Sequence, residues 1–162
     1  MNRGRGRKII KYAVFVAYIA MLVYLVLFAE MFGRTAVSRE YRYNLVPFKE
    51  ISRFITYYHQ LGFTAVMLNL VGNIVAFMPF GFCLPMLSDR RTGLLKVTVF
   101  SFALSLAIEL MQLVTRVGSC DVDDLILNTL GGVLGYACYI LVCNMCRRFK
   151  QESGDKETED VA

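Results

Sequence analysis

The sequence has few of the groups on which soluble enzymes and metalloproteins depend. Among 162 residues there is a single histidine, His59, with no second histidine or cysteine beside it, which favours a surface role over metal binding. The sequence contains no His-Glu-x-x-His pattern, no Gly-x-Ser-x-Gly pattern and no glycine loop that cradles phosphate. We therefore expect no cofactor, and no familiar catalytic motif identifies a reaction.

Cysteine and charge are also limited. The five cysteines are odd in number and irregularly spaced, so they do not form a disulfide framework. Only 19% of the residues are charged, whereas 56% are hydrophobic, and the charges fall in short blocks between long apolar runs. This pattern is typical of a membrane protein, because a helix needs about 20 apolar residues to cross the bilayer core.

Four apolar runs predict an all-α integral membrane protein, a bundle of four transmembrane helices. The expected helices cover residues 9–32, 63–87, 94–115 and 125–146. They make residues 1–150 one membrane domain, and the polar residues 151–162 a disordered cytoplasmic tail. Pro79 and Pro85 are expected to kink or break the second helix.

The distribution of basic residues predicts the orientation. With the N-terminus inside, twelve of the 18 lysines and arginines fall on the inner side and six on the outer side. Basic residues collect on the cytoplasmic side of membrane helices, so we expect both termini in the cytoplasm of a multi-pass protein of the cell membrane. The same bias accounts for the net charge of +5 without a nucleic-acid partner.

The first outer segment, residues 33–62, has its own pattern. Ile51, Phe54, Ile55, Tyr58 and Leu61 recur at helical spacing, with polar residues largely between them. This spacing predicts a short amphipathic helix lying in the outer membrane interface, which starts near Pro47 and ends near Gly62.

Polar residues within the runs are expected to meet near the outer face, because a charged side chain inside a bilayer is costly and needs a reason. We predict one polar ligand-binding pocket, open to the outer leaflet. Its candidate residues are Asn44, Asn69, Asn73, Glu109, Gln112, Arg116, Asp121, Asp124 and Asn128. The simpler alternative is that these groups only satisfy one another across the helices. Asp121, Asp123 and Asp124 are weak candidates for a metal site, although acidic residues also suit a helix N-terminus.

Small residues in the helices suggest close packing. Backbones approach each other closely where side chains are absent, and homo-dimerisation is a second use of such a surface. The residues assigned to helix packing are Pro79, Gly81, Gly131, Gly132 and Gly135.

Four blocks of sequence together resemble the VanZ-like family of bacterial membrane proteins. They are Asn44-Leu-Val-Pro-Phe48, Asn69-x-x-x-Asn73 with Phe77-Met-Pro-Phe-Gly81, Glu109-x-x-Gln112, and Asp121-Val-Asp-Asp-Leu-Ile-Leu-Asn-Thr-Leu-Gly-Gly132 followed by Gly135. The resemblance runs from about Asn44 to Gly135. It implies a multi-helix membrane fold and a bacterial, often Gram-positive, host.

The resemblance also implies a role, because the family's named member gives low-level resistance to teicoplanin. The first hypothesis is a resistance or cell-envelope factor that binds membrane lipid, a lipid-linked cell-wall precursor or the lipoglycopeptide. The second is an intramembrane enzyme that acts on a lipid-linked cell-wall or phospholipid substrate through its Asp and Glu cluster. A third is a structural partner in a larger complex, with Gly131 and Gly135 at the contact.

Overall fold

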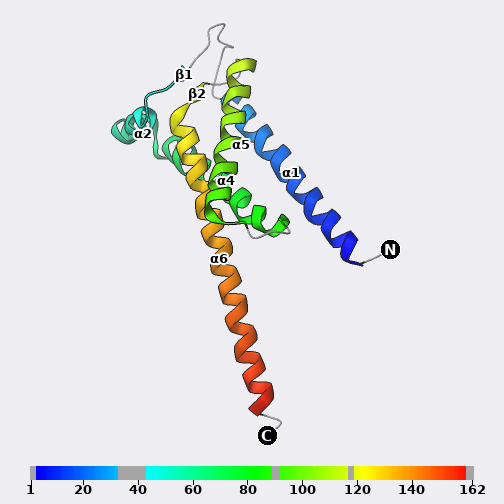
Figure 1. Ribbon diagram of the computed structural model, residues 1–162. Coiled ribbons are helices and arrows are strands. Elements are labelled where there is room, and N and C mark those ends of the chain that lie inside the picture. Colours follow the sequence, from blue (N-terminus) through cyan, green and yellow to red (C-terminus); the bar gives the residue numbers. More distant parts are fainter. Residues whose placement is uncertain (1–2, 33–42, 89–91, 117–118, 160–162) are drawn as a thin grey trace.

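Four long helices dominate the computed structural model, which describes residues 3–32, 43–88, 92–116 and 119–159. Each contains a stretch long and apolar enough to cross a membrane. The helices are α1 (Arg3–Phe32), α4 (Phe63–Leu87), α5 (Leu94–Thr115) and α6 (Val122–Glu159) (Figure 1). The predicted all-α fold with four transmembrane helices is confirmed.

The helix ends agree with the sequence in the middle of the chain and differ at its two ends. Helices α4 and α5 have the predicted limits, and α4 continues through Pro79 and Pro85 without a break. Helix α1 begins at Arg3, six residues before the apolar run. Helix α6 continues to Glu159, so residues 151–159 are helical where the sequence predicts a disordered tail. The segment is rich in Glu, Lys and Gln, which favour helix, and it has no proline to stop α6.

The predicted amphipathic helix is present as two short pieces, α2 (Lys49–Thr56) and α3 (Tyr58–Leu61). They are separated at Tyr57, and Gly62 follows with a φ of 84°, a conformation that glycine adopts easily. Two short parallel strands, β1 (Tyr43–Asn44) and β2 (Cys120–Asp121), pair just before α2 and α6. This pairing fixes the residues just before α2 against the start of α6.

Glycines set the distance between α4 and α6. A Cβ atom added at Gly131 would lie 2.2 Å from the Ile74 carbonyl oxygen, and one at Gly135 would lie 1.9 Å from that of Met78. A Cβ at Gly81 would lie 1.8 Å from the Gly132 carbonyl oxygen. The two backbones are therefore in direct contact, and the small residues act here within one chain.

Helix α1 diverges from the other three toward its N-terminal end (Figure 1). The Tyr18 hydroxyl donates to the Ala76 carbonyl oxygen at 2.6 Å, and Leu22 is buried with Phe77 of α4 and Ile108 of α5. Nearer the N-terminus of α1, the Tyr12 hydroxyl donates to the Leu87 carbonyl oxygen at 3.0 Å. A few specific contacts thus hold α1 to the bundle.

The molecule has two distinct ends along its helix axes. We call the end with β1, β2 and α2 the strand end, and the end with the residues joining α4 to α5 the connection end. The start of α1 and the final turns of α6 lie away from the strand end (Figure 1).

Candidate functional site

The predicted polar residues meet at the strand end, around the first turn of α6. Parallel pairing of β1 with β2 places Asn44 opposite Asp121, while α4 and α5 bring Asn73 and Glu109 to the same place. We call Asn44, Asn73, Glu109, Asp121, Asp123 and Asp124 the polar cluster. Glu109 and Asp123 are each only 1% exposed, so the cluster lies inside the protein.

Asp123 caps a helix other than its own. One carboxylate oxygen accepts the Phe48 amide, and the other accepts the amides of Glu50 at 2.8 Å and Ile51 at 3.1 Å. These amides belong to the start of α2, where Phe48 provides no side-chain cap. The first amides of a helix need acceptors from outside it, and Asp123 supplies them from the first turn of α6.

Asp121 caps α6 itself and ties it to β1. Its Oδ1 accepts the Asp123 amide at 2.9 Å and the Asn44 side-chain amide at 3.1 Å. The Asp121 backbone amide in turn donates to Glu109 Oε2 at 2.8 Å, which links α5 to the same turn. Burial raises the pKa of the Asp121 carboxyl above its usual value, although its two hydrogen bonds oppose that shift.

Two further bonds connect α6 to its neighbours. The Asn73 side-chain amide of α4 donates to Asp124 Oδ1 at 2.6 Å. One turn deeper, Asn128 Nδ2 donates to the Ser105 hydroxyl of α5 at 2.9 Å. Asn69, one turn before Asn73, lies at an exposed position.

Gln112 and Arg116 differ in position although their spacing predicts a shared helix face with Glu109. Gln112 is buried beside the cluster at 2% exposure. Arg116 is exposed and follows the last turn of α5, with a φ of 56°. Arg116 is seven residues after Glu109 and would share its helix face if α5 continued. The helix ends at Thr115, because Arg116 has left-handed backbone geometry.

Three buried polar atoms lack a hydrogen-bond partner within the described residues. They are the Ser101 hydroxyl, Gln112 Oε1 and Asn128 Oδ1. Ser101 and Gln112 belong to α5 and Asn128 belongs to α6, and buried polar groups are nearly always hydrogen-bonded. Such atoms mark where a bound molecule or water could add a bond.

The three aspartates proposed as weak metal candidates point to three different partners, namely Asn44, the start of α2, and Asn73. Within the described ranges, no group of three or more His, Cys, Asp or Glu side chains is arranged to hold a metal ion. Burial raises the pKa of the neighbouring Cys120 thiol, which keeps it protonated and weakly nucleophilic.

Sequence reasoning missed two features of this region. Ser101 and Ser105 continue the buried face of Glu109 along α5, a relation that i, i+4, i+8 spacing could have revealed. Phe48 adopts a left-handed conformation, with a φ of 64°, and its side chain is 60% exposed. No periodicity signals such a conformation in a phenylalanine.

Four membrane-length helices around a buried group of acids and amides define a multi-pass α-helical membrane protein with a polar interior at one end. A family model described as VanZ/LLP1 matches residues 15–143, and the chain belongs to this family. It is 29% identical over 134 residues to Protein VanZ from Enterococcus faecium, in an alignment that covers 82% of this chain and 74% of that protein. No solved structure matches the chain. The resemblance identified from the sequence is thus confirmed.

Proposed function

We propose that this protein contributes to resistance against teicoplanin-type glycopeptides, or to cell-envelope homeostasis, by binding an amphipathic ligand at its strand end. The ligand class is a lipid-linked cell-wall precursor or the lipoglycopeptide itself. Membership of the VanZ/LLP1 family supports the role. The arrangement of polar and apolar groups at the strand end supports this choice of ligand.

The observation that carries the proposal is an exposed apolar surface directly beside the buried polar cluster. Tyr43 is 66% exposed and Leu45 is 67% exposed, and they flank Asn44, whose side chain is buried and bonded to Asp121. Phe48 is exposed next to the amides that Asp123 holds. A ligand with an acyl chain and a polar head has a matching division between an apolar part and a polar part.

The proposed orientation has both termini in the cytoplasm and the strand end in the outer leaflet. The twelve-to-six distribution of basic residues supports it. The start of α1 and the end of α6 both lie away from the strand end, which agrees with this arrangement (Figure 1). The polar cluster would then face the leaflet where lipid-linked precursors and glycopeptides meet.

The enzyme alternative has less support. Asp121, Asp123 and Asp124 already accept hydrogen bonds from the protein itself, and the Cys120 thiol is held protonated. Binding without turnover therefore fits the described contacts better than acid–base or metal-assisted chemistry does.

The test is glycopeptide susceptibility in a Gram-positive host with and without this chain. Teicoplanin and vancomycin are compared, because teicoplanin carries an acyl chain for the apolar surface. The variants are Leu45→Ser, which changes that surface, and Glu109→Gln with Asp124→Asn, which changes the cluster. Thr98→Ala serves as a control, since Thr98 bonds only within α5, to the Leu94 carbonyl oxygen.

All variants must reach equal abundance in the membrane. We expect the intact chain and Thr98→Ala to raise tolerance to teicoplanin but not to vancomycin, with both other variants losing the effect. No change in tolerance with the intact chain would contradict the proposal. Equal protection by all variants would show that the strand end does not cause the tolerance.

A further inference from the structure

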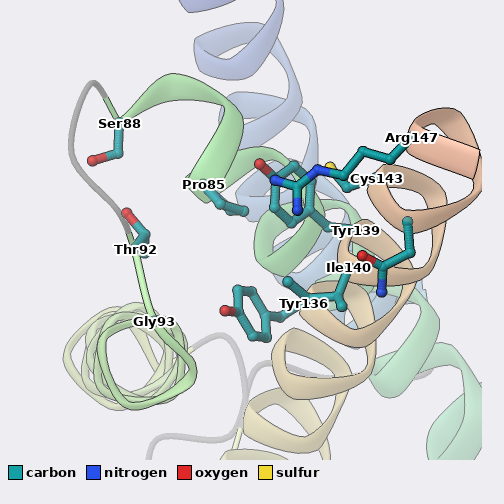
Figure 2. Close-up of a pocket in the computed structure, with 10 residues that line it drawn as sticks. Pro85, Ser88, Thr92, Gly93, Tyr136, Tyr139, Ile140, Cys143 and Arg147 are labelled. Atoms are coloured by element: carbon teal, nitrogen blue, oxygen red, sulfur yellow. The ribbon is translucent and has the colours of Figure 1, made fainter. Parts of the chain in front are cut away.

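A hollow that is separate from the polar cluster lies at the connection end. It has a volume of about 590 Å³ and lies between α6 and the residues around the α4–α5 connection. Figure 2 shows Ser88 and Thr92 on one side of the hollow, and Tyr136, Tyr139 and Arg147 on the other. Asn144 adds an amide to the lining, so the hollow has several hydrogen-bond donors.

The hollow lies where the apolar spans end. The spans of α4, α5 and α6 are Val66–Leu87, Leu94–Thr115 and Val122–Phe149, so Ser88, Thr92 and Arg147 lie at or near their limits. In a bilayer this is the level of the lipid head groups, where tyrosine and arginine are favoured. The lining therefore has the composition of a membrane-interface site.

The charge around the hollow is positive. Arg147 of α6 lines the hollow. Two further basic residues, Arg148 of α6 and Lys96 of α5, are exposed. Lys11 lies beside Tyr12, whose hydroxyl bonds to Leu87, so α1 adds a further basic residue to this end. Among the side chains that the structure describes, none of the ten that line the hollow is acidic.

The wall formed by α6 is fixed by aromatic packing. The rings of Tyr136 and Tyr139 stack with centroids 6.3 Å apart, and Phe82 of α4 meets Tyr139 edge to face at 5.9 Å. Ile140 is 38% exposed and gives the same wall an apolar surface. The hollow thus offers a preformed polar recess beside an apolar flank.

We infer that the hollow at the connection end binds the phosphate head group of an anionic phospholipid. Arg147 provides the counter-charge, Ser88, Thr92 and Asn144 provide neutral donors, and the acyl chains lie against the apolar flank of α6. Basic recesses between membrane helices recognise anionic head groups by this combination of charge and hydrogen bonding. The inference is independent of glycopeptide binding at the strand end.

The test measures lipid binding to the full-length protein in detergent by native mass spectrometry. The probes are phosphatidylglycerol and, as a zwitterionic control, phosphatidylcholine with the same acyl chains. The variant Arg147→Gln is compared with Arg148→Gln, which removes the same charge one residue away and outside the hollow. Both residues are exposed, so neither change should disturb folding. Arg147→Lys tests whether a positive charge alone suffices.

We expect phosphatidylglycerol to bind in preference to phosphatidylcholine. Arg147→Gln should weaken its binding about tenfold, as loss of a charge-assisted contact does, whereas Arg148→Gln should change it less than about twofold. Arg147→Lys should fall between these values. Equal losses for the two glutamine variants, or equal binding of the two lipids, would overturn the inference. Displacement of the lipid by millimolar glycerol 3-phosphate would also overturn it, by assigning the hollow to a soluble phosphate ester.

Discussion

The two ends of the molecule treat charge in opposite ways. At the strand end, four acidic side chains accept hydrogen bonds from other segments, namely Glu109, Asp121, Asp123 and Asp124. At the connection end, the basic residue Arg147 lines an open hollow, and none of the lining side chains that the structure describes is acidic. The first end is closed by its own contacts, and the second is open.

The difference follows from the depth at which each charge lies. Asp123 is almost fully buried, so its carboxylate must be satisfied inside the protein, and the start of α2 does this. Arg147 lies near the end of an apolar span, where an arginine guanidinium can extend to the membrane–water interface. A charge in the first setting organises the fold, whereas a charge in the second remains available to a ligand.

The largest expected loss of stability comes from removing the hydrogen bonds between Asp123 and the start of α2. Asp123→Asn keeps one acceptor oxygen and places an NH2 donor opposite the backbone amide or amides that the other oxygen accepts, so we expect a loss of about 3 kcal/mol in the free energy of unfolding. Thermal unfolding in detergent measures it, with Thr98→Ala as the control. A loss no greater than that of the control would show that Asp123 does not hold α2.

The close backbone contact between α4 and α6 lies between the two ends. A substitution at a glycine can disrupt it without changing any charge. Gly131→Ala places a methyl group against the Ile74 carbonyl oxygen and should cost about 2 kcal/mol through overpacking. The control is Gly72→Ala in α4, where an added Cβ meets nothing within 4 Å and should stabilise the helix slightly. Similar melting temperatures for the two variants would contradict the close backbone contact.

The left-handed backbone conformation of Phe48 provides a separate test of the strand end. Phe48→Gly relieves the left-handed conformation, whereas Phe48→Ala removes the same exposed ring and keeps the strain. We expect the glycine variant to be more stable than the alanine variant by about 1 kcal/mol. Both should lose teicoplanin tolerance equally if the ring contacts the ligand. A more stable alanine variant would argue against strain at this residue.

The smallest expected effect concerns Asp121. Its Oδ1 accepts hydrogen bonds from the Asn44 side chain and the Asp123 amide, and the carbonyl oxygen of Asn can take its place. Asp121→Asn should therefore change stability by less than about 1 kcal/mol at neutral pH. Because the folded-state pKa of Asp121 is raised, ionisation disfavours the folded state. The intact protein should lose stability as pH rises from the usual aspartate value through that raised pKa.

Melting temperatures of the intact protein and of Asp121→Asn, compared across that acid window, test this sign. The stability of the variant relative to the intact protein should rise with pH. A relative stability that falls with rising pH would mean that the carboxylate, not the carboxylic acid, is the favoured folded form.

Much of the fold follows from the sequence, because apolar length decides where a chain can cross a membrane. The limits of α4 and α5 were predictable, since polar or glycine residues interrupt hydropathy on both sides. The extent of α6 was not, because a helix that leaves the membrane can continue on propensity alone. The meeting of Asn73, Glu109 and the aspartates was predictable from helical spacing and depth.

The roles within the cluster were less accessible. Asp123 looked like a weak metal ligand because its partners, the amides of Phe48, Glu50 and Ile51, lie more than 70 positions away in the chain. Arg116 was expected on the same helix face as Glu109 from its spacing, but α5 ends at Thr115 and Arg116 leaves that face. Tertiary contacts and helix ends, which a single sequence records poorly, decided both.

The most direct test of the closed strand end is hydrogen exchange at the start of α2. The amides of Glu50 and Ile51 are followed in the intact protein and in Asp123→Asn, with α5 as an internal reference. We expect protected amides in the intact protein and exchange at least about tenfold faster in the variant, with α5 unchanged. Rapid exchange of these amides in the intact protein would contradict the claim that Asp123 clamps the outer segment to α6.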